Sequence, residues 1–205
     1  VVEFGHFASM AAFADPEVKA VWCVRGGSTA WQVLPLLDYT LIAGHPKPLI
    51  GFSDVTTLHL ALGQRCGLVT YHGPTATRVL SWGETDGFSW RSLQRALSLE
   101  SGLTIENPPG EPIRILRPGR ASGVLTGGNL SLVTASVGTP WQINAKGRIL
   151  CLEDVGEAVY SLDRMLSQLR YAGILEDAAG LVFGPFSNCR NAYRESYGPE
   201  ELLRD

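Results

Sequence analysis

The chain has 205 residues and a mass of 22.2 kDa, and its 45% hydrophobic and 18% charged residues exclude a wholly disordered protein. Its net charge of −3 and pI near 5.8 leave no basic excess for a nucleic-acid backbone, so DNA and RNA are not expected partners. Polar, charged, Gly or Pro residues interrupt every apolar run before the roughly 20 residues that cross a bilayer, so no membrane partner is expected.

The first part of the chain follows a β-turn-α-β pattern that begins as a fold entered midway, without a leader-peptide pattern. Residues 11–19 favour a helix, and residues 19–24 favour a buried parallel strand that ends at Arg25-Gly26-Gly27. Helical spacing over 29–39, a strand over 49–52, a helix over 55–66 stopped by Gly67 and a strand over 68–74 follow.

A change of character in the middle of the chain predicts a crossing between two domains. A short helix over 92–102 precedes the Pro-rich segment 106–119. We therefore expect an N-terminal domain at 1–78, a crossing at 79–118 and a C-terminal domain at 119–205. The last part predicts strands over 121–128, 147–153 and 178–186, with helices over 129–138 and 155–173. This alternation is typical of an α/β fold with mostly parallel sheets, whose ligand site lies at the carboxyl ends of the strands.

The four cysteines indicate the redox compartment. Cys23, Cys66, Cys151 and Cys189 form no CxxC pair and have no histidine at metal-ligand spacing, so no metal site is expected. Cys23 and Cys151 lie in strand-like apolar runs, where a reduced cysteine behaves as a small hydrophobe. We therefore expect a reducing, cytoplasmic location.

Three turns fall at the predicted edge of the sheets, namely Arg25-Gly26-Gly27, the turn at 51–54 and Glu153-Asp154, and each has two interpretations. Ser53-Asp54 either caps a helix or forms a nucleophile elbow, in which the serine hydroxyl projects above the sheet. Arg25-Gly26-Gly27 is either a tight connection or a cradle of backbone N–H groups for an anion, and it lacks the pattern of a nucleotide loop. Gly127-Gly128-Asn129 is interpreted as structural, with Asn129 as a helix cap.

Glu153 ends the apolar run ILCL, where a carboxylate needs a partner. It is either a structural ion-pair or capping residue, or it orients a catalytic histidine. Asp154 is interpreted as a solvated or capping charge. His72 follows a strand and is the histidine in a site-like position, although a structural role is favoured for it; His6, His45 and His59 have weaker claims as a general base.

Six segments in order resemble the L,D-carboxypeptidase family of serine peptidases, which includes the microcin C immunity peptidases. They are RGG at 25–27, HPKPLIGFSDVTTLHLAL at 45–62, GLVTYHGP at 67–74, LTGGNLSLV at 125–133, GTPW at 138–141 and ILCLEDVGEAVYSLDRMLSQL at 149–169. The resemblance covers most of residues 12–190. Ser28-Thr29 depart from it, because many relatives have an aromatic residue after RGG.

The resemblance implies a flavodoxin-like N-terminal parallel-sheet domain and a smaller C-terminal α/β domain. Ser53 would be the nucleophile and Glu153 the acid of a Ser-Glu-His triad. Backbone N–H groups of Asp54 and of Gly26 or Gly27 would form the oxyanion hole. The family's histidine is expected beyond Asp205, and its first strand region before the present start, so both domains are expected to be incomplete at the chain ends.

The implied activity is release of the terminal D-alanine from murein tetrapeptides in cytoplasmic cell-wall recycling, without metal or cofactor. Arg25, Arg78 or a helix N-terminus would bind the carboxylate of the substrate, and a homodimer is expected. Two alternatives stay open. One is a microcin C-type immunity peptidase acting on a peptide-nucleotide amide, and the other is an inactive small-ligand binding module on the same fold.

Overall fold

The computed structural model describes residues 6–82, 87–98, 102–191 and 197–204. Its first half is built on a parallel sheet in which the strand order is β1 (Val21–Trp22), β2 (Leu49–Gly51) and β3 (Thr70–His72). The helices of this half are α1 (His6–Ala14), α2 (Ala30–Val33), the 3-10 helix η1 (Leu34–Leu36), α3 (Tyr39–Gly44), the 3-10 turn η2 (Ser53–Val55) and α4 (Thr56–Cys66). Buried apolar side chains from the sheet and these helices form one core.

Two helices in this half have bounds that differ from the predicted ones, and a proline explains each difference. Pro35 has no N–H to donate, so the helix predicted over 29–39 narrows to the 3-10 helix η1 and ends. A new helix, α3, then begins where the side chain of Asp38 accepts the Leu41 N–H. The helix predicted over 11–19 is displaced to His6–Ala14, ending before Pro16 because the residue preceding a proline disfavours helical geometry.

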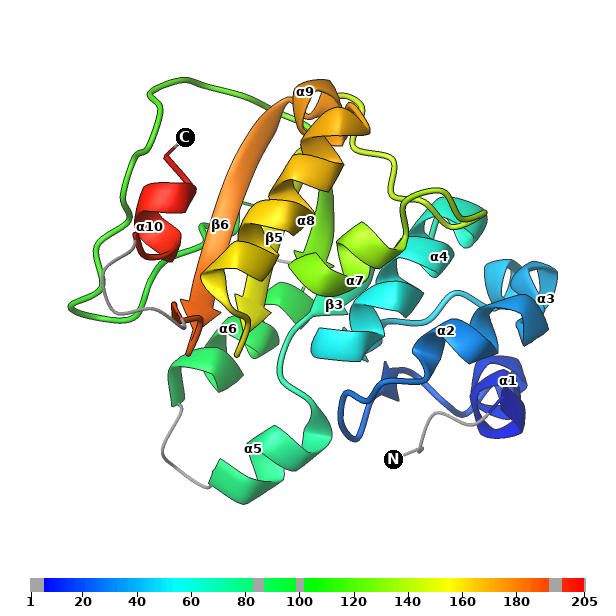
Figure 1. Ribbon diagram of the computed structural model, residues 1–205. Helices are drawn as coiled ribbons and strands as arrows, with labels where there is room; N and C mark the ends of the chain where they lie inside the picture. The colour runs from blue at the N-terminus through cyan, green and yellow to red at the C-terminus, as the bar shows by residue number, and fades with distance from the viewer. Residues whose placement is uncertain (1–5, 83–86, 99–101, 192–196, 205) are drawn as a thin grey trace.

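Helices α5 (Ala76–Trp82) and α6 (Gly87–Leu97) follow the first sheet. The helix expected over 92–102 therefore begins earlier than predicted, its residues 99–101 lie outside the described residues, and α5 was not predicted. Trp90 of α6 stacks on Trp22 of β1 with ring centroids 6.0 Å apart, which attaches α6 to the first sheet. An irregular segment, 102–124, then passes α10 (Pro199–Leu202), to which Arg114 is joined by an ion pair with Glu200 (Figure 1).

A second parallel sheet forms the other half, in the order β4 (Leu125–Asn129), β5 (Ile149–Val155) and β6 (Gly180–Ser187). Helices α7 (Leu130–Ala135), α8 (Val159–Tyr171) and α9 (Ile174–Asp177) complete it, and α8 crosses one face of the sheet (Figure 1). The predicted α/β fold with parallel sheets is confirmed. The domain boundaries at 78 and 119 remain a prediction.

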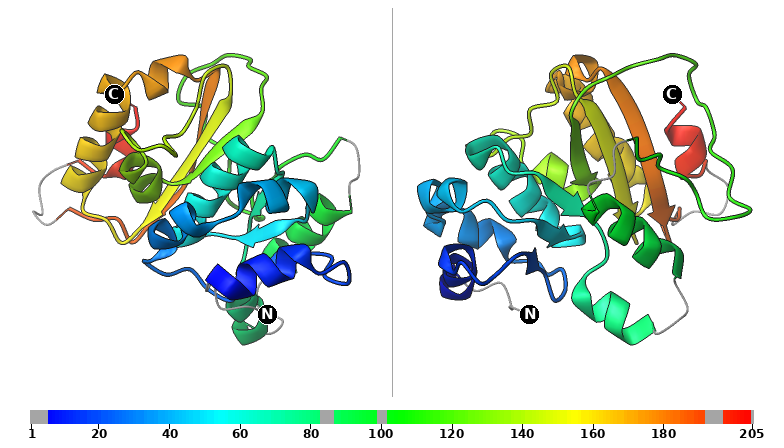
Figure 2. Two further views of the ribbon diagram at one scale, coloured as in Figure 1. Left: turned by 90° about the vertical axis from the view of Figure 1, so that its right-hand side faces the viewer. Right: turned by 180° about the vertical axis from the view of Figure 1, so that it is seen from behind.

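Helix α4 joins the two halves. It contacts α2 and α3 on one side and β4 and α7 on the other (Figure 2). Seven of its consecutive residues, from Thr56 to Leu62, are buried, because this helix has neighbours on both sides. Since α4 follows the Ser53–Val55 turn without a break, the packing of α4 fixes the Ser53 turn relative to both sheets. No helix among the described residues is long and apolar enough to span a membrane.

Candidate active site

Ser53 occupies a strained turn at the carboxyl end of β2. Its φ is +64°, a left-handed conformation that a serine adopts only where its surroundings enforce it. Phe52 is extended before it, η2 begins with Ser53, and α4 follows at Thr56, so the chain turns sharply from strand to helix. The N-cap residues of η2 and α4 are Phe52 and Val55, so Ser53 does not occupy the capping position of either helix.

The Arg25-Gly26-Gly27 turn lies directly against Ser53. A Cβ placed on Gly26 would lie 3.1 Å from Ser53 Oγ, and a Cβ on Gly27 would lie 3.3 Å from Asp54 Oδ2. The Asp54 side chain accepts the N–H groups of Thr29 and Ala30, each at 3.0 Å, and so holds the start of α2 beside the turn. Within the described residues, the N–H groups of Gly26 and Gly27 donate no hydrogen bond.

Strand alternation aims Glu153 and Asp154 of β5 in opposite directions. Leu150 and Leu152 are buried in the core formed with α7 and α8, and Asp154 shares their face. Glu153 faces the other way. The pairing of β5 with β6 shifts in register between Leu152 and Asp154. At this point a Cβ placed on Gly184 of β6 would lie 3.1 Å from Glu153 Cβ. The absence of a side chain at Gly184 therefore permits this close approach to Glu153.

The Glu153 carboxyl is poorly solvated. Only 21% of its side chain is exposed, and Oε1 is buried without a hydrogen-bond partner among the described residues. Burial raises the pKa of Glu153 to about 7, and the negative charge of Asp154 makes a smaller contribution in the same direction. A hydrogen bond from Asn129 lowers this pKa. The imidazole of His72 lies beside it, with Nε2 3.7 Å from Oε1, and burial lowers the pKa of this histidine and so favours its neutral form.

Asp154 is a structural clamp. Its two oxygens accept hydrogen bonds from the Asn129 side chain, from the N–H and hydroxyl groups of Ser131, and from the Val155 N–H. The solvated interpretation is therefore wrong, because Asp154 is 3% exposed. The predicted cap is confirmed, since Asn129 Oδ1 accepts the Leu132 N–H at the start of α7.

The glycine pair before Asn129 brings β4 against the Ser53 turn. Gly127 and Gly128 have φ values of +119° and +131°, and a Cβ on Gly127 would lie 1.9 Å from the Cys151 carbonyl oxygen. A Cβ on Gly128 would lie 2.6 Å from Thr56 Oγ1. The same Thr56 oxygen accepts the Asn129 N–H at 3.0 Å. The first turn of α4 is therefore fastened directly to the carboxyl end of β4.

The remaining predicted residues occupy different positions. Arg25 is exposed beside the glycine turn and has no ion pair with a described residue, while Arg78 lies on α5, also exposed. His45 contacts the Leu41 carbonyl at an exposed turn. The side chain of His6 is not among the side chains that the structure describes. Among the described residues, no three His, Cys, Asp or Glu side chains form a group that could hold a metal.

Comparison with known proteins matches each half of the chain to a known protein domain. Residues 8–73 match the LD-carboxypeptidase N-terminal domain, and residues 122–205 match the LD-carboxypeptidase C-terminal domain. The crystal structure of muramoyltetrapeptide carboxypeptidase from Oxalobacter formigenes is 30% identical with a TM-score of 0.82, covering 97% of this chain and 67% of that chain. The chain belongs to the LD-carboxypeptidase family.

Two further comparisons locate the chain within this family. The probable murein peptide carboxypeptidase of Bacillus subtilis is 41% identical over 194 residues, which are 94% of this chain and 60% of that protein. A structure of MccF in complex with glutamyl sulfamoyl guanosine has a TM-score of 0.82 at 22% identity, covering 97% of this chain and 66% of that one; this likeness concerns the fold alone. The chain thus spans about 60% of the length of its B. subtilis relative.

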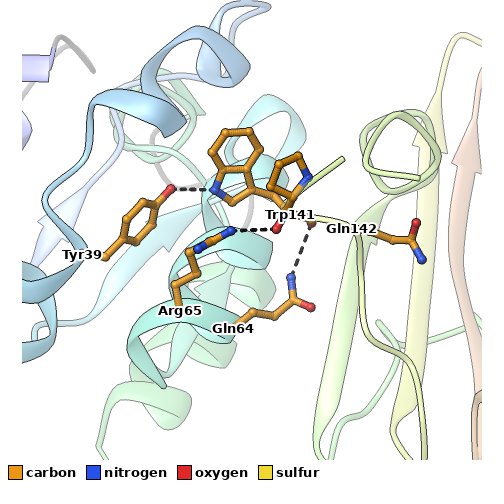
Figure 3. A pocket seen from close by; sticks show the side chains of 6 residues that line it. Tyr39, Gln64, Arg65, Trp141 and Gln142 are labelled. Carbon is orange, nitrogen blue, oxygen red and sulfur yellow. Dashed lines mark hydrogen bonds between the residues drawn. The ribbon is translucent and has the colours of Figure 1, made fainter. Parts of the chain in front are cut away.

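An aromatic joint lies at the other end of α4 in this LD-carboxypeptidase family member (Figure 3). Trp141 Nε1 donates to the Tyr39 hydroxyl at 2.9 Å, and the Arg65 guanidinium lies over both rings. Arg65 also donates to the Pro140 carbonyl. A cleft of about 450 Å³ opens here, but α4 has 11 residues and is about 16 Å long, which separates the cleft from Ser53.

Sequence reasoning missed three residues that support the site: Thr56, Asp154 as a buried clamp, and His59. His59 is 8% exposed and its Nε2 lies 2.9 Å from the Gly51 carbonyl oxygen. One signal was present for Asp154, because strand alternation after ILCL assigns adjacent carboxylates to opposite faces. The contacts of Thr56 and His59 depend on which segments meet in the fold, and local patterns carry no such information.

Proposed function

We propose that the full-length protein is a serine-type L,D-carboxypeptidase that removes the terminal D-alanine from murein tetrapeptides. The observation that carries this proposal is the backbone of Ser53, held at φ +64° at a strand-to-helix turn with Gly26 against its hydroxyl. Strain of this kind is retained where a nucleophile must project above a sheet. The relatives named muramoyltetrapeptide carboxypeptidase and probable murein peptide carboxypeptidase support the choice of substrate.

In the proposed mechanism, Ser53 Oγ attacks the amide carbonyl between the L-centre of the third residue and D-alanine. Its proton passes to a histidine base, and the carbonyl oxygen becomes an oxyanion. The N–H groups of Asp54 and of Gly26 or Gly27 stabilise this oxyanion. Collapse of the tetrahedral intermediate breaks the C–N bond, the base returns its proton to the leaving D-alanine nitrogen, and water then hydrolyses the acyl-enzyme ester.

Glu153 is proposed as the acid that orients the base. Its Oε1 is buried and lacks a hydrogen-bond donor among the described residues, so the carboxylate has acceptor positions open to an imidazole N–H. We propose that this base is a histidine beyond Asp205, as the resemblance implied. His59 is a poor candidate because it is buried against Gly51, and burial lowers its pKa to about 4.

A carboxypeptidase also binds the free carboxylate of its substrate, and we propose Arg25 for this role. Its guanidinium is exposed and unpaired within the described residues, and it precedes the glycine that contacts Ser53. An arginine can hold a carboxylate through two parallel hydrogen bonds. Arg78, on the neighbouring α5, is the second candidate.

The cellular setting is part of the proposal. The four cysteines are free, and burial raises the pKa of the Cys23 thiol to about 12, so this thiol is unreactive at neutral pH. These properties fit a reducing cytoplasm and a role in peptidoglycan recycling. A homodimer is also expected, and light scattering of the purified protein would measure it.

The experiment that tests the substrate compares two amides. The full-length protein is incubated with a murein tetrapeptide ending in D-alanine and, separately, with a peptidyl-nucleotide amide, and the release of D-alanine or nucleotide is measured. We expect kcat/KM for the tetrapeptide to exceed that for the peptidyl-nucleotide by at least about 100-fold, a difference of about 2.7 kcal/mol in transition-state binding. The reverse preference would favour the immunity-peptidase alternative, and cleavage of neither would favour the binding module.

A further inference from the structure

His72 lies where the two sheets approach each other. It ends β3, paired with Gly51 of β2, and its Nε2 is 3.7 Å from Oε1 of Glu153 on β5. The carboxylate oxygen that it faces is the one that lacks a hydrogen-bond donor among the described residues. A closure of roughly half an ångström would bring the two atoms to hydrogen-bonding distance, and contacts in an unliganded site are commonly this long.

Two rings and a short backbone network hold His72 in this position. The Phe52 ring meets its imidazole edge-on with centroids 6.4 Å apart, and the His59 ring lies on another side at 6.0 Å. The Gly51 carbonyl oxygen accepts the Gly73 N–H at 3.0 Å and also contacts His59 Nε2 at 2.9 Å. His59 is thus tied to the backbone that carries His72.

When Glu153 is ionised, as a triad acid must be, the contact with His72 has one direction, because the carboxylate only accepts and the imidazole donates. A carbonyl oxygen only accepts, so His59 Nε2 carries a proton and donates it to Gly51, and His59 stays neutral because burial lowers its pKa to about 4. Burial also lowers the pKa of His72, although 38% of its side chain is exposed. The other ionisable group near Glu153 is Asp154, a carboxylate that cannot donate when ionised.

We propose that His72 is a positioning residue for the reaction: its Nε2–H binds Oε1 of Glu153 across the two sheets and fixes the orientation of that carboxylate. The inference rests on the proposed function, since it assigns Glu153 the role of triad acid. An ionised carboxylate has about four acceptor positions, so His72 and a catalytic histidine can both donate to it. His72 would then act on the rate through Glu153, without touching the substrate.

The test uses two substitutions that place an amide nitrogen differently. In His72→Gln the side-chain nitrogen reaches approximately the position of Nε2, whereas in His72→Asn it reaches only that of Nδ1. His45→Gln, at an exposed turn away from Ser53, is the matched control. For each full-length variant, kcat and KM for the tetrapeptide are measured, together with the rate at which a fluorophosphonate labels Ser53 and the melting temperature.

We expect His72→Asn to lower kcat and the labelling rate by about 10- to 100-fold with KM unchanged, the usual size of an effect exerted through a neighbouring ligand. His72→Gln should stay within a few-fold of the wild type, as should His45→Gln. In a Glu153→Gln background, His72→Asn should add little, because the interaction has already been removed.

Several results would overturn this role. One is an unchanged kcat in a folded His72→Asn variant. Another is a double variant, His72→Asn with Glu153→Gln, whose fold-loss in kcat equals the product of the two single losses. The third is a rise in KM with no change in kcat. If His72→Asn does not fold, a folded His72→Gln variant that loses more than about tenfold in labelling rate overturns it as well. Labelling of Ser53 without release of D-alanine would reject the proposed substrate while the labelling rates still decide the role of His72. Absence of labelling at Ser53 in the wild type would reject both.

Discussion

Ser53 and Glu153 reach the same region of the molecule through different backbone devices. Ser53 is raised by a left-handed φ at the end of β2, and Glu153 is aimed by strand alternation and by the shifted pairing of β5 with β6. The place of Ser53 between a strand and a helix was predictable because that pattern is local, whereas the choice between a cap and a nucleophile rested on the family resemblance. The surroundings of Glu153 were not, because Gly184 and His72 are 31 and 81 positions away in sequence.

The pKa of Glu153 makes stability depend on pH. Burial raises the pKa of this carboxyl from 4.5 to about 7 in the folded chain. A raised folded-state pKa means that the neutral acid stabilises the fold at low pH, and that this contribution is lost as the pH rises from about 4.5 through about 7. In the wild type, the free energy of unfolding should therefore decrease between about pH 4.5 and about pH 7. Glu153→Gln should make this decrease smaller, and urea denaturation at a series of pH values measures it.

The exposed Glu111 provides the control for that measurement. Glu111→Gln should leave the pH dependence of unfolding as it is in the wild type. If Glu153→Gln and Glu111→Gln give the same profile, the Glu153 carboxyl is not desolvated in the way described.

Arg25 carries the prediction on substrate binding. Arg25→Gln should raise KM for the tetrapeptide by about 10-fold or more, because a charge-assisted hydrogen bond contributes about 1.5–3 kcal/mol. Its effect on kcat should be small if the contact is equally strong in the ground state and the transition state. Steady-state kinetics decide this, with Arg148→Gln, remote in sequence from the turn, as a control. An unchanged KM would transfer the assignment to Arg78.

At the scale of elements, the parallel strands were predictable and the helix boundaries were less so. Continuous apolar runs such as residues 149–152 indicate buried strands wherever they occur. The helix over 29–39 failed because apolar spacing continued through Pro35, and the missing N–H of that proline outweighed the spacing. Helix α5 was missed because its seven residues are too few to show a clear period.

The glycine pair of β4 yields a test of how the elements meet. Gly128→Ala introduces a Cβ 2.6 Å from Thr56 Oγ1 at a φ of +131°. Gly138→Ala has a comparable backbone problem, with a φ of +79°, but no atom within 4 Å. Backbone strain costs about 1–3 kcal/mol at either site, so only Gly128→Ala should show an additional loss from the clash.

Chemical denaturation of the two variants separates these contributions. Gly128→Ala should lower the unfolding free energy more than Gly138→Ala, and it should also slow labelling of Ser53, because Thr56 starts the helix that follows this serine. Equal destabilisation of the two variants, with unchanged labelling, would mean that the contact between β4 and Thr56 adjusts freely.

At the scale of the whole molecule, α4 and the aromatic joint hold the two sheets together. Trp141 comes from the second half of the chain and bonds Tyr39 in the first, a separation of 102 residues. The GTPW motif was visible in the sequence, but its partner was not, because contacts between distant segments depend on the assembled fold. The same reason explains why the approach of His72 to Glu153 was not predicted.

Removing this joint should destabilise the protein measurably. Trp141→Ala eliminates a hydrogen bond to Tyr39 and the contact of the Arg65 guanidinium with the indole ring, and we expect a loss of about 2 kcal/mol, or roughly 4–8 °C in Tm. Tyr171→Ala, at a side chain that is 88% exposed, is the control and should leave Tm unchanged. Calorimetry gives both values. Equal Tm for the two variants would show that the joint does not hold the halves together.

The central claim is that Ser53 is the nucleophile of an amide hydrolase, and the most direct measurement is D-alanine release from a murein tetrapeptide by the full-length protein and its Ser53→Ala variant. The side chain contributes little packing, so the variant should keep the wild-type Tm. Its kcat should fall by about 10⁶-fold, as expected when a triad nucleophile is removed. A folded Ser53→Ala variant that still releases D-alanine at a rate near that of the wild type would contradict the account.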